Sequence, residues 1–161
     1  MVFAIVGAGD GRSPGTAHAY RHTVAAVITH AARHRFAAAR VARLATVTPA
    51  GDPHLVPIVF VLLGDVVWSA VDRKPKSTSR LRRLENVTAH PRVSLLVDHY
   101  DENWSTLWWV RADGVATIEA LDPAREALTA LAAKYPQYRA EPPPGPVIRV
   151  DVDTWAEWAA E

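Results

Sequence analysis

The sequence has no cysteine among its 161 residues, which excludes disulfide bonds, thiolate metal sites and cysteine nucleophiles. It has no apolar run near the roughly 20 residues of a membrane span, and no basic residue precedes the short apolar start, as one would in a signal peptide. It also lacks an excess of either charge, with 18 basic and 17 acidic residues, whereas a general nucleic-acid binder is usually strongly basic. We therefore expect a cytoplasmic protein with no membrane partner and no nucleic-acid partner.

The positive charge that is present is concentrated in one segment. Residues 73–83, RKPKSTSRLRR, contain six of the 18 basic residues. They lead into a predicted helix from about Ser79 to Ala89, and basic and hydroxyl side chains beside the free N–H groups of a helix start favour an anion such as phosphate. A solvated surface loop is the alternative for any basic run. A nucleic-acid contact is disfavoured because no aromatic residues interleave the bases.

The first 28 residues are predicted to be an extension of the main domain. Gly7 and Gly9 follow an apolar run, but Arg12 stands where a dinucleotide-binding motif requires its third glycine. The extension is expected to be partly helical or loosely ordered. Alanine content and helical spacing predict one long helix or two short ones from Thr16 to about Arg40.

Two histidines in this helical stretch have the spacing of a metal-binding pair. His30 and His34 are four residues apart, but the sequence lacks both the glutamate of the H-E-x-x-H motif and a nearby third ligand. We interpret them as solvated residues of a helix face and predict no metal site.

Residues 29–161 are predicted to form one mainly β (α+β) domain, a six- to seven-stranded antiparallel barrel with peripheral helices. Alternating apolar residues and turn signals predict strands at 40–48, 53–63, 66–71, 93–97, on either side of Asp113–Gly114 within 104–120, and at 147–158. Besides the helix at 79–89, a helix is predicted at 121–135 with Asp122 as its N-cap, followed by a proline-rich connector at 136–146. The strand at 53–63 is apolar on both faces, so both faces must be covered.

Trp108 and Trp109 are adjacent in one predicted strand, so they must face opposite sides. We expect one of them inside and the other in a subunit contact or against a flat aromatic ligand. No nucleophile has a recognisable base partner, because no serine lies in a G-x-S-x-G context and the acidic residues are scattered. No catalytic residue is therefore assigned, and if the protein is an enzyme, a cofactor carries its chemistry.

Several linked segments together resemble one protein family. They are LATVTPAGDPHLVPI (44–58), the basic segment, NVTAHPRVSLLV (86–97), and the tryptophan-rich strand that ends in DGVATI (113–118). In this order they resemble the pyridoxamine 5'-phosphate oxidase-like split β-barrel proteins, and among these the flavin and deazaflavin oxidoreductases that include probable coenzyme F420-dependent enzymes. The resemblance covers about residues 30–158.

The resemblance implies a homodimer with the cofactor in a groove between the subunits. It implies a small-molecule substrate and hydride transfer with coenzyme F420. The alternatives are FMN in the same groove, or a flavin- or deazaflavin-binding protein without turnover.

The resemblance also implies which residues contact the cofactor. The phosphate would lie on the basic segment, at Lys74, Lys76, Ser77, Ser79, Arg80 and Arg83. The strand behind the ring system would be Pro57, Ile58 and Val59. The edge of the site opposite the phosphate would be Ser69, Ala70 and Val71. Trp108 and Trp109 would lie where the partner subunit closes the site.

Overall fold

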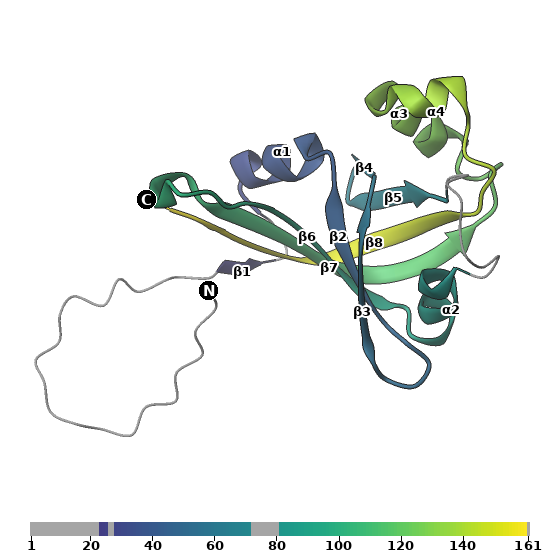
Figure 1. Cartoon of the computed structure of the whole chain (residues 1–161), viewed down its shortest axis with the longest axis horizontal. Coiled ribbons are helices and arrows are strands. Elements are labelled where there is room, and N and C mark those ends of the chain that lie inside the picture. The colour runs from purple at the N-terminus through teal and green to yellow at the C-terminus, as the bar shows by residue number, and fades with distance from the viewer. Residues whose placement is uncertain (1–22, 26–27, 72–80, 161) are drawn as a thin grey trace, which may run out of the picture.

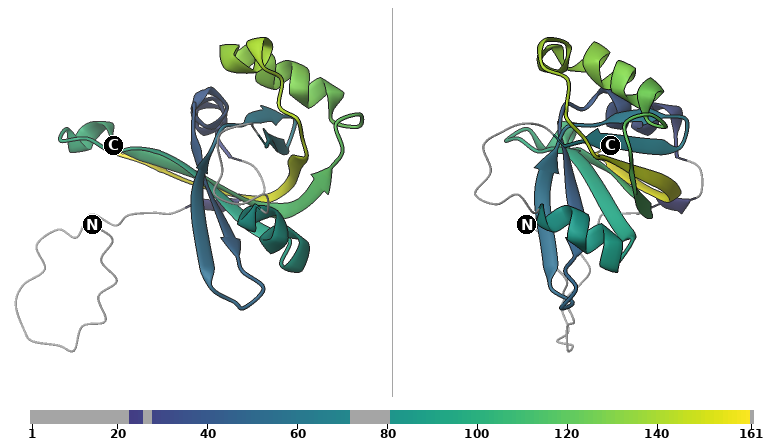
Figure 2. Two further views of the ribbon diagram at one scale, coloured as in Figure 1. Left: turned by 45° about the vertical axis from the view of Figure 1, so that its right-hand side comes forward. Right: turned by 90° about the vertical axis from the view of Figure 1, so that its right-hand side faces the viewer.

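The computed structural model describes residues 23–25, 28–71 and 81–160, and its strands form one curled antiparallel sheet. The order across the sheet is β3-β2-β6-β7-β8-β5-β4, and β1 pairs with β8. The sheet curls into a partly closed barrel (Figures 1 and 2). The predicted mainly β barrel is thereby confirmed. The strands are β1 (Thr23–Ala25), β2 (Ala42–Val47), β3 (Pro53–Ile58), β4 (Val61–Leu63), β5 (Val66–Ala70), β6 (Arg92–His99), β7 (Trp108–Glu119) and β8 (Val147–Ala159).

The helices lie around the sheet. In Figure 1, α1 (His30–Ala38) lies on one side of the barrel and α2 (Arg82–Ala89) on the other, while α3 (Arg125–Lys134) and α4 (Pro136–Ala140) lie beside β4 and β5. A short 3-10 helix, η1 (Trp104–Thr106), lies in the β6–β7 loop. None of the helices in the described part of the chain is long and apolar enough to cross a membrane.

The main core fills the barrel between α1 and α2. Residues at every second position of β2 and β6 are buried, as expected when one face of a strand packs inward. Phe36 of α1 contacts the rings of Phe60 and Trp155 edge-on, each at a centroid distance of 5.1 Å. Val87 of α2 belongs to the same buried cluster. Both helices are therefore anchored to one hydrophobic core.

A second, smaller cluster lies between α3, α4 and the β4–β5 hairpin. Its polar centre is the hydroxyl of Tyr135, which accepts a hydrogen bond from the backbone N–H of Phe60 at 3.1 Å. The same hydroxyl lies 2.8 Å from the carbonyl oxygen of Phe60 and 3.0 Å from that of Arg40, either of which can accept its proton. Burial raises the pKa of Tyr135, so this hydroxyl keeps its proton. It ties the helical pair to the chain where β3 passes into β4.

The prediction of one long helix or two short ones from Thr16 to about Arg40 is wrong in part. Residues 23–25 form a strand that pairs antiparallel with residues 155–157 of β8, and α1 begins only at His30. The reason lies in β8, which continues past the end of its pairing with β5 and offers backbone groups to β1. Strand pairing outweighs the helix propensity of an alanine-rich segment.

Two of the predicted strands differ from those observed. The strand at 53–63 breaks at Val59 and Phe60 into β3 and β4, which lie at opposite ends of the sheet order. Residues 108–119 form one strand, β7, with a register shift between Asp113 and Gly114. Gly114 is needed there because a Cβ would lie 2.3 Å from the carbonyl oxygen of Asp151.

Two predictions near α3 also differ. Helix α3 begins at Arg125 with Ala124 as its N-cap, and the carboxylate of Asp122 pairs with the Arg125 side chain instead of capping the helix. The predicted connector at 136–146 contains the short helix α4, with Pro136 in its first turn. Proline fits this position because its missing N–H would be unpaired there.

Candidate functional site

The structure describes some of the predicted cofactor-binding residues but not all of them. Lys74, Lys76, Ser77, Ser79 and Arg80 lie outside the described residues, so their placement stays a prediction. The others lie on β3, β5, α2 and β7 or directly beside them: Pro57, Ile58, Val59, Ser69, Ala70, Val71, Arg83, Trp108 and Trp109.

The residue after β3 and the end of β5 belong to one hydrophobic region. Val59, directly after β3, packs against the second hydrophobic cluster, which includes Ala70 of β5. Ser69 and Val71 are buried, whereas Pro57 is exposed. The structure thus brings the two predicted segments together. A ligand on this wall would meet Pro57 and backbone atoms more than side chains.

The two tryptophans face opposite sides of β7, as predicted. Trp108 lies on the inner face, where the guanidinium of Arg35 is 5.4 Å from its ring centroid and the ring of His99 stacks at 6.3 Å. Trp109 lies on the outer face and is the cross-strand neighbour of Trp158 on β8. A single surface of this subunit therefore cannot present both rings to one ligand.

A row of side chains on the outer face connects Trp109 with Pro57. Pro57 pairs with Arg43 of β2, and Arg43 forms an ion pair with Asp98 of β6. Asp98 is in turn the cross-strand neighbour of Trp109. Two residues that are far apart in the sequence thus share one face of the sheet, with a charge pair between them.

An open groove of about 550 Å³ continues along this part of the sheet. Ser94 and Arg111 both donate hydrogen bonds to the carboxylate of Asp113, at 2.6 and 2.9 Å. Arg92 pairs with Asp153 at the rim, and this contact raises the pKa of Arg92 and lowers that of Asp153. The groove therefore offers hydrogen-bond donors and acceptors, and each of these charged side chains is already paired with one of opposite charge. Its lining residues are Ala45, Thr46, Val47, Pro53, Arg92, Val93, Ser94, Arg111, Asp113 and Thr154.

Sequence reasoning missed these groove residues, although a signal was present. Arg92 and Ser94 occupy alternate positions of β6, and Arg111 and Asp113 do the same on β7. Because side chains two apart share a face, the two pairs can be placed on one surface once β6 and β7 are aligned. The same alternation describes any solvent-exposed sheet face, so it does not distinguish a groove by itself.

The start of α2 combines two arginines with a buried polar atom that has no hydrogen-bond partner. Its N-cap residue, Leu81, makes no side-chain hydrogen bond, and Arg82 and Arg83 occupy its first turn together with Glu85. Cations are unfavourable there because the helix dipole places positive charge at the N-terminus. The Nε of Arg83 is buried and has no hydrogen-bond partner. An anion at this helix start would compensate both features, so the residues present fit a phosphate group.

A buried polar chain links α2 with the groove. Asn86 of α2 is fully buried, and its Nδ2 donates to the hydroxyl of Thr46 at 2.8 Å. Thr46 is a groove-lining residue and lies 3.3 Å from the carbonyl oxygen of His54. The Oδ1 of Asn86 has no partner. A buried hydrogen bond thus joins the middle of α2 to β2 beneath the groove.

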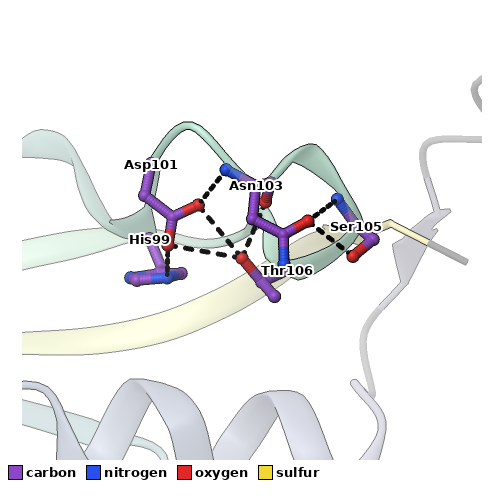
Figure 3. Close-up of polar contacts among 5 residues, drawn as sticks. All are labelled: His99, Asp101, Asn103, Ser105 and Thr106. Atoms are coloured by element: carbon purple, nitrogen blue, oxygen red, sulfur yellow. Dashed lines mark hydrogen bonds and ion pairs between the residues drawn. The ribbon is translucent and has the colours of Figure 1, made fainter.

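The loop between β6 and β7 is fixed by its own polar side chains (Figure 3). The carboxylate of Asp101 accepts hydrogen bonds from the backbone N–H of Asn103 at 2.8 Å and the hydroxyl of Thr106 at 3.2 Å, and pairs with His99 at 2.9 Å. Trp104, within this loop, is 76% exposed. In Figure 1 the loop ends an arm that extends beyond the rest of the barrel.

Three solved structures with the same fold illustrate the range of similar proteins. A FAD-binding protein from Mesorhizobium loti has a TM-score of 0.62 and 18% identity, covering 86% of this chain and 99% of that one. An F420 reductase has a TM-score of 0.60 and 21% identity, covering 80% and 98%. A heme-binding protein from Mycobacterium smegmatis has a TM-score of 0.57 and 22% identity, covering 78% and 48%. At these identities the likeness shows the fold alone.

The sequence itself matches one protein family. No curated protein matches the chain. The family model of pyridoxamine 5'-phosphate oxidase matches residues 28–159, a range that includes α2, the groove and both ends of the barrel. The chain therefore belongs to the pyridoxamine 5'-phosphate oxidase family, as its split-barrel fold and its resemblance to flavin and deazaflavin proteins indicate.

Proposed function

We propose that the protein is an oxidoreductase that binds coenzyme F420 and transfers hydride between the reduced coenzyme and an unsaturated small molecule in the cytoplasm. The observation that carries this proposal is the start of α2, where the last two arginines of the basic segment occupy a helix N-terminus without a side-chain cap. Family membership and the shared fold of an F420 reductase support it. When bound, the coenzyme would supply the hydride chemistry, and the protein would bind and orient it.

Each part of the site has a distinct task in this proposal. Arg83, with its unpartnered Nε, would bind the coenzyme phosphate together with the other residues of the basic segment. The wall formed by the ends of β3 and β5 would support the flat ring system. The groove on the outer face of the sheet, with paired Arg111 and Asp113, would accept a neutral polar part of the coenzyme or substrate. Positioning two reactants in this way removes much of the entropic barrier to their reaction.

We further propose that a second copy of the chain covers the outer face of the sheet. Val47, Leu55 and Val115 lie on this face and are 36%, 64% and 38% exposed. Burying such side chains is favourable by roughly 25 cal/mol per Å² of apolar surface. We expect Leu55→Glu to convert the dimer to a monomer in sedimentation velocity, and Leu121→Glu, at an exposed apolar position before α3, to leave the dimer intact. A wild-type monomer would contradict this arrangement.

The cofactor is tested by titrating the purified protein with F420, FMN and hemin while following tryptophan fluorescence. We expect saturable F420 binding that weakens about ten- to hundredfold in Arg83→Gln, since a contact to a charged group is worth roughly 1 to 3 kcal/mol. Arg125→Gln is the matched control, because Arg125 is exposed on α3, away from α2, and pairs there with Asp122. Saturable binding of FMN alone would identify the FMN-dependent alternative.

Turnover is tested separately from binding. The reduced coenzyme is mixed with the protein and a panel of enones, quinones and tetrapyrroles, and its oxidation is followed by absorbance. Consumption that saturates with one substrate class supports the proposed activity. Tight binding without consumption by any member of the panel would identify a flavin- or deazaflavin-binding protein without turnover.

A further inference from the structure

One lysine lies in an unusual place, far from the basic segment. The chain has three lysines, and Lys134, the last residue of α3, is the one outside residues 73–83. Its Nζ donates to the carbonyl oxygen of Ala37 in the last turn of α1 at 2.7 Å. The same nitrogen lies 4.3 Å from the ring centroid of Phe60 and 5.6 Å from that of Tyr135. The amine is therefore half-buried on an aromatic surface where α1 meets α3.

A second cation lies beside this amine. Arg40 donates from Nη1 to the backbone carbonyl oxygen of Lys134 at 2.6 Å, and its guanidinium lies 4.7 Å from the ring centroid of Tyr135. Within the described part of the chain, no carboxylate forms an ion pair with either cation. Two neighbouring cations without a counterion attract anions.

This environment makes the amine more reactive than an ordinary lysine. Burial, and secondarily the charge of Arg40, lowers the pKa of Lys134 from 10.5 to about 8. A larger share of the side chain is then neutral near physiological pH, and only the neutral amine is a nucleophile. Desolvation and a neighbouring cation are two established ways in which proteins activate a lysine.

We propose that Lys134 is a site of N-acylation by small acyl phosphates. The negative charge of the acyl phosphate is drawn to the Arg40 guanidinium, which forms no ion pair among the described residues, and this places the carbonyl carbon near Nζ. The neutral amine attacks that carbon and forms a C–N bond. The C–O bond to phosphate breaks, the phosphate leaves with the electron pair, and the proton lost from nitrogen passes to solvent.

The product changes the junction between α1 and α3. The amide nitrogen retains one N–H, which can still donate to the carbonyl oxygen of Ala37. The positive charge above Phe60 is lost, and with it the favourable cation–π contact. Acylation therefore replaces a charged link between the two helices by a neutral one.

The test uses acetyl phosphate and the folded full-length chain, with the acetylation of each lysine quantified by peptide mass spectrometry. Lys74 and Lys76 serve as internal references. At pH 7.5 we expect Lys134 to react about tenfold faster than either, because the gain in neutral amine is partly offset by the lower nucleophilicity of a less basic group. The rate at Lys134 should level off above pH 8, whereas the reference rates keep rising. In the urea-unfolded chain all three rates should become similar.

Arg40→Gln tests the role of the neighbouring cation, with Arg139→Gln on α4 as the matched control. We expect the preference for Lys134 to fall in Arg40→Gln and to persist in Arg139→Gln, with circular dichroism showing that both variants are folded. Equal or slower reaction of Lys134 in the folded wild-type protein would overturn the proposal. So would a pH profile without a plateau, a result that needs no variant.

Discussion

The two helices that pack into the barrel core, α1 and α2, differ in how their polar groups are satisfied. At α1, Thr29 caps the first turn by accepting a hydrogen bond from the backbone N–H of Ala32 at 3.2 Å, and its own hydroxyl donates to Glu157 at 2.8 Å. The C-terminal end of α1 is bound by Lys134. At α2, the N-cap is Leu81, and the Nε of Arg83 has no partner.

This difference indicates that α1 has a structural role, whereas α2 is available to bind a ligand. Buried polar groups in folded proteins are almost always paired, so an unpaired one calls for an explanation. Around α1 the pairing is made within the chain. Around α2 the buried Nε of Arg83 still needs an acceptor, and a bound anion can supply it.

The largest expected change in stability comes from a substitution in α1. Phe36→Ala removes the ring that contacts both Phe60 and Trp155, and we expect the free energy of unfolding to fall by about 3 to 5 kcal/mol. Urea unfolding followed by tryptophan fluorescence measures this loss. Phe36→Leu, which keeps most of the volume, should cost much less. Equal losses in the two variants would show that the ring contacts do not anchor α1.

A smaller effect is expected from the cap of the same helix. Thr29→Ala removes the side-chain acceptor for the Ala32 N–H and the hydroxyl bond to Glu157. We expect a loss of about 1 kcal/mol in the free energy of unfolding. Thr29→Ser, which keeps the hydroxyl, is the control and should retain most of the stability.

The converse change gives α2 the cap that it lacks. Leu81→Asp places a carboxylate beside the first N–H groups and the two arginines, and we expect the protein without coenzyme to gain roughly 0.5 to 1 kcal/mol. Because the carboxylate occupies the place proposed for the phosphate, F420 affinity should fall. Leu81→Asn caps without charge and should weaken binding less. Unchanged F420 affinity in Leu81→Asp would show that the phosphate does not bind at this helix start.

The smallest effect concerns the C-terminal end of α1 and depends on pH. The pKa of Lys134 is about 8 in the folded protein and 10.5 in the unfolded chain, so between these values the unfolded chain binds more protons. Stability therefore rises with pH through this window. We expect this contribution to be on the order of 0.5 kcal/mol, because the amine is half-exposed. The difference between the wild-type protein and Lys134→Met, measured by urea unfolding from pH 7 to 10, should show it.

The strands could largely be predicted because their signals are local. Alternation located β2, β6 and β8 to within a few residues, and the Gly64 turn between β4 and β5 has the positive φ of 57° that glycine readily adopts. The break at Val59 and the continuity of β7 through Gly114 could not be predicted. Both depend on which strands become neighbours after folding, and the local sequence does not contain that information.

The candidate site could be predicted only in outline. The basic segment pointed to an anion site, and the described end of that segment, Arg82 and Arg83, does form a helix start without a cap. The groove was not predicted, because Arg111 and Asp113 acquire a common surface with Ser94 only when β6 and β7 pair in their observed register. Sites made from the faces of several strands require knowledge of the sheet order.

The three residues of β1 have a practical consequence for shortening the chain. The family match begins at residue 28, so a protein trimmed to that boundary would lack Thr23–Ala25. The backbone of residues 155–157 would then form an exposed sheet edge, which can pair with another molecule. Such a trimmed protein should aggregate more readily than one that begins at residue 20, so the shortest well-behaved form of this protein extends beyond the range of its family match.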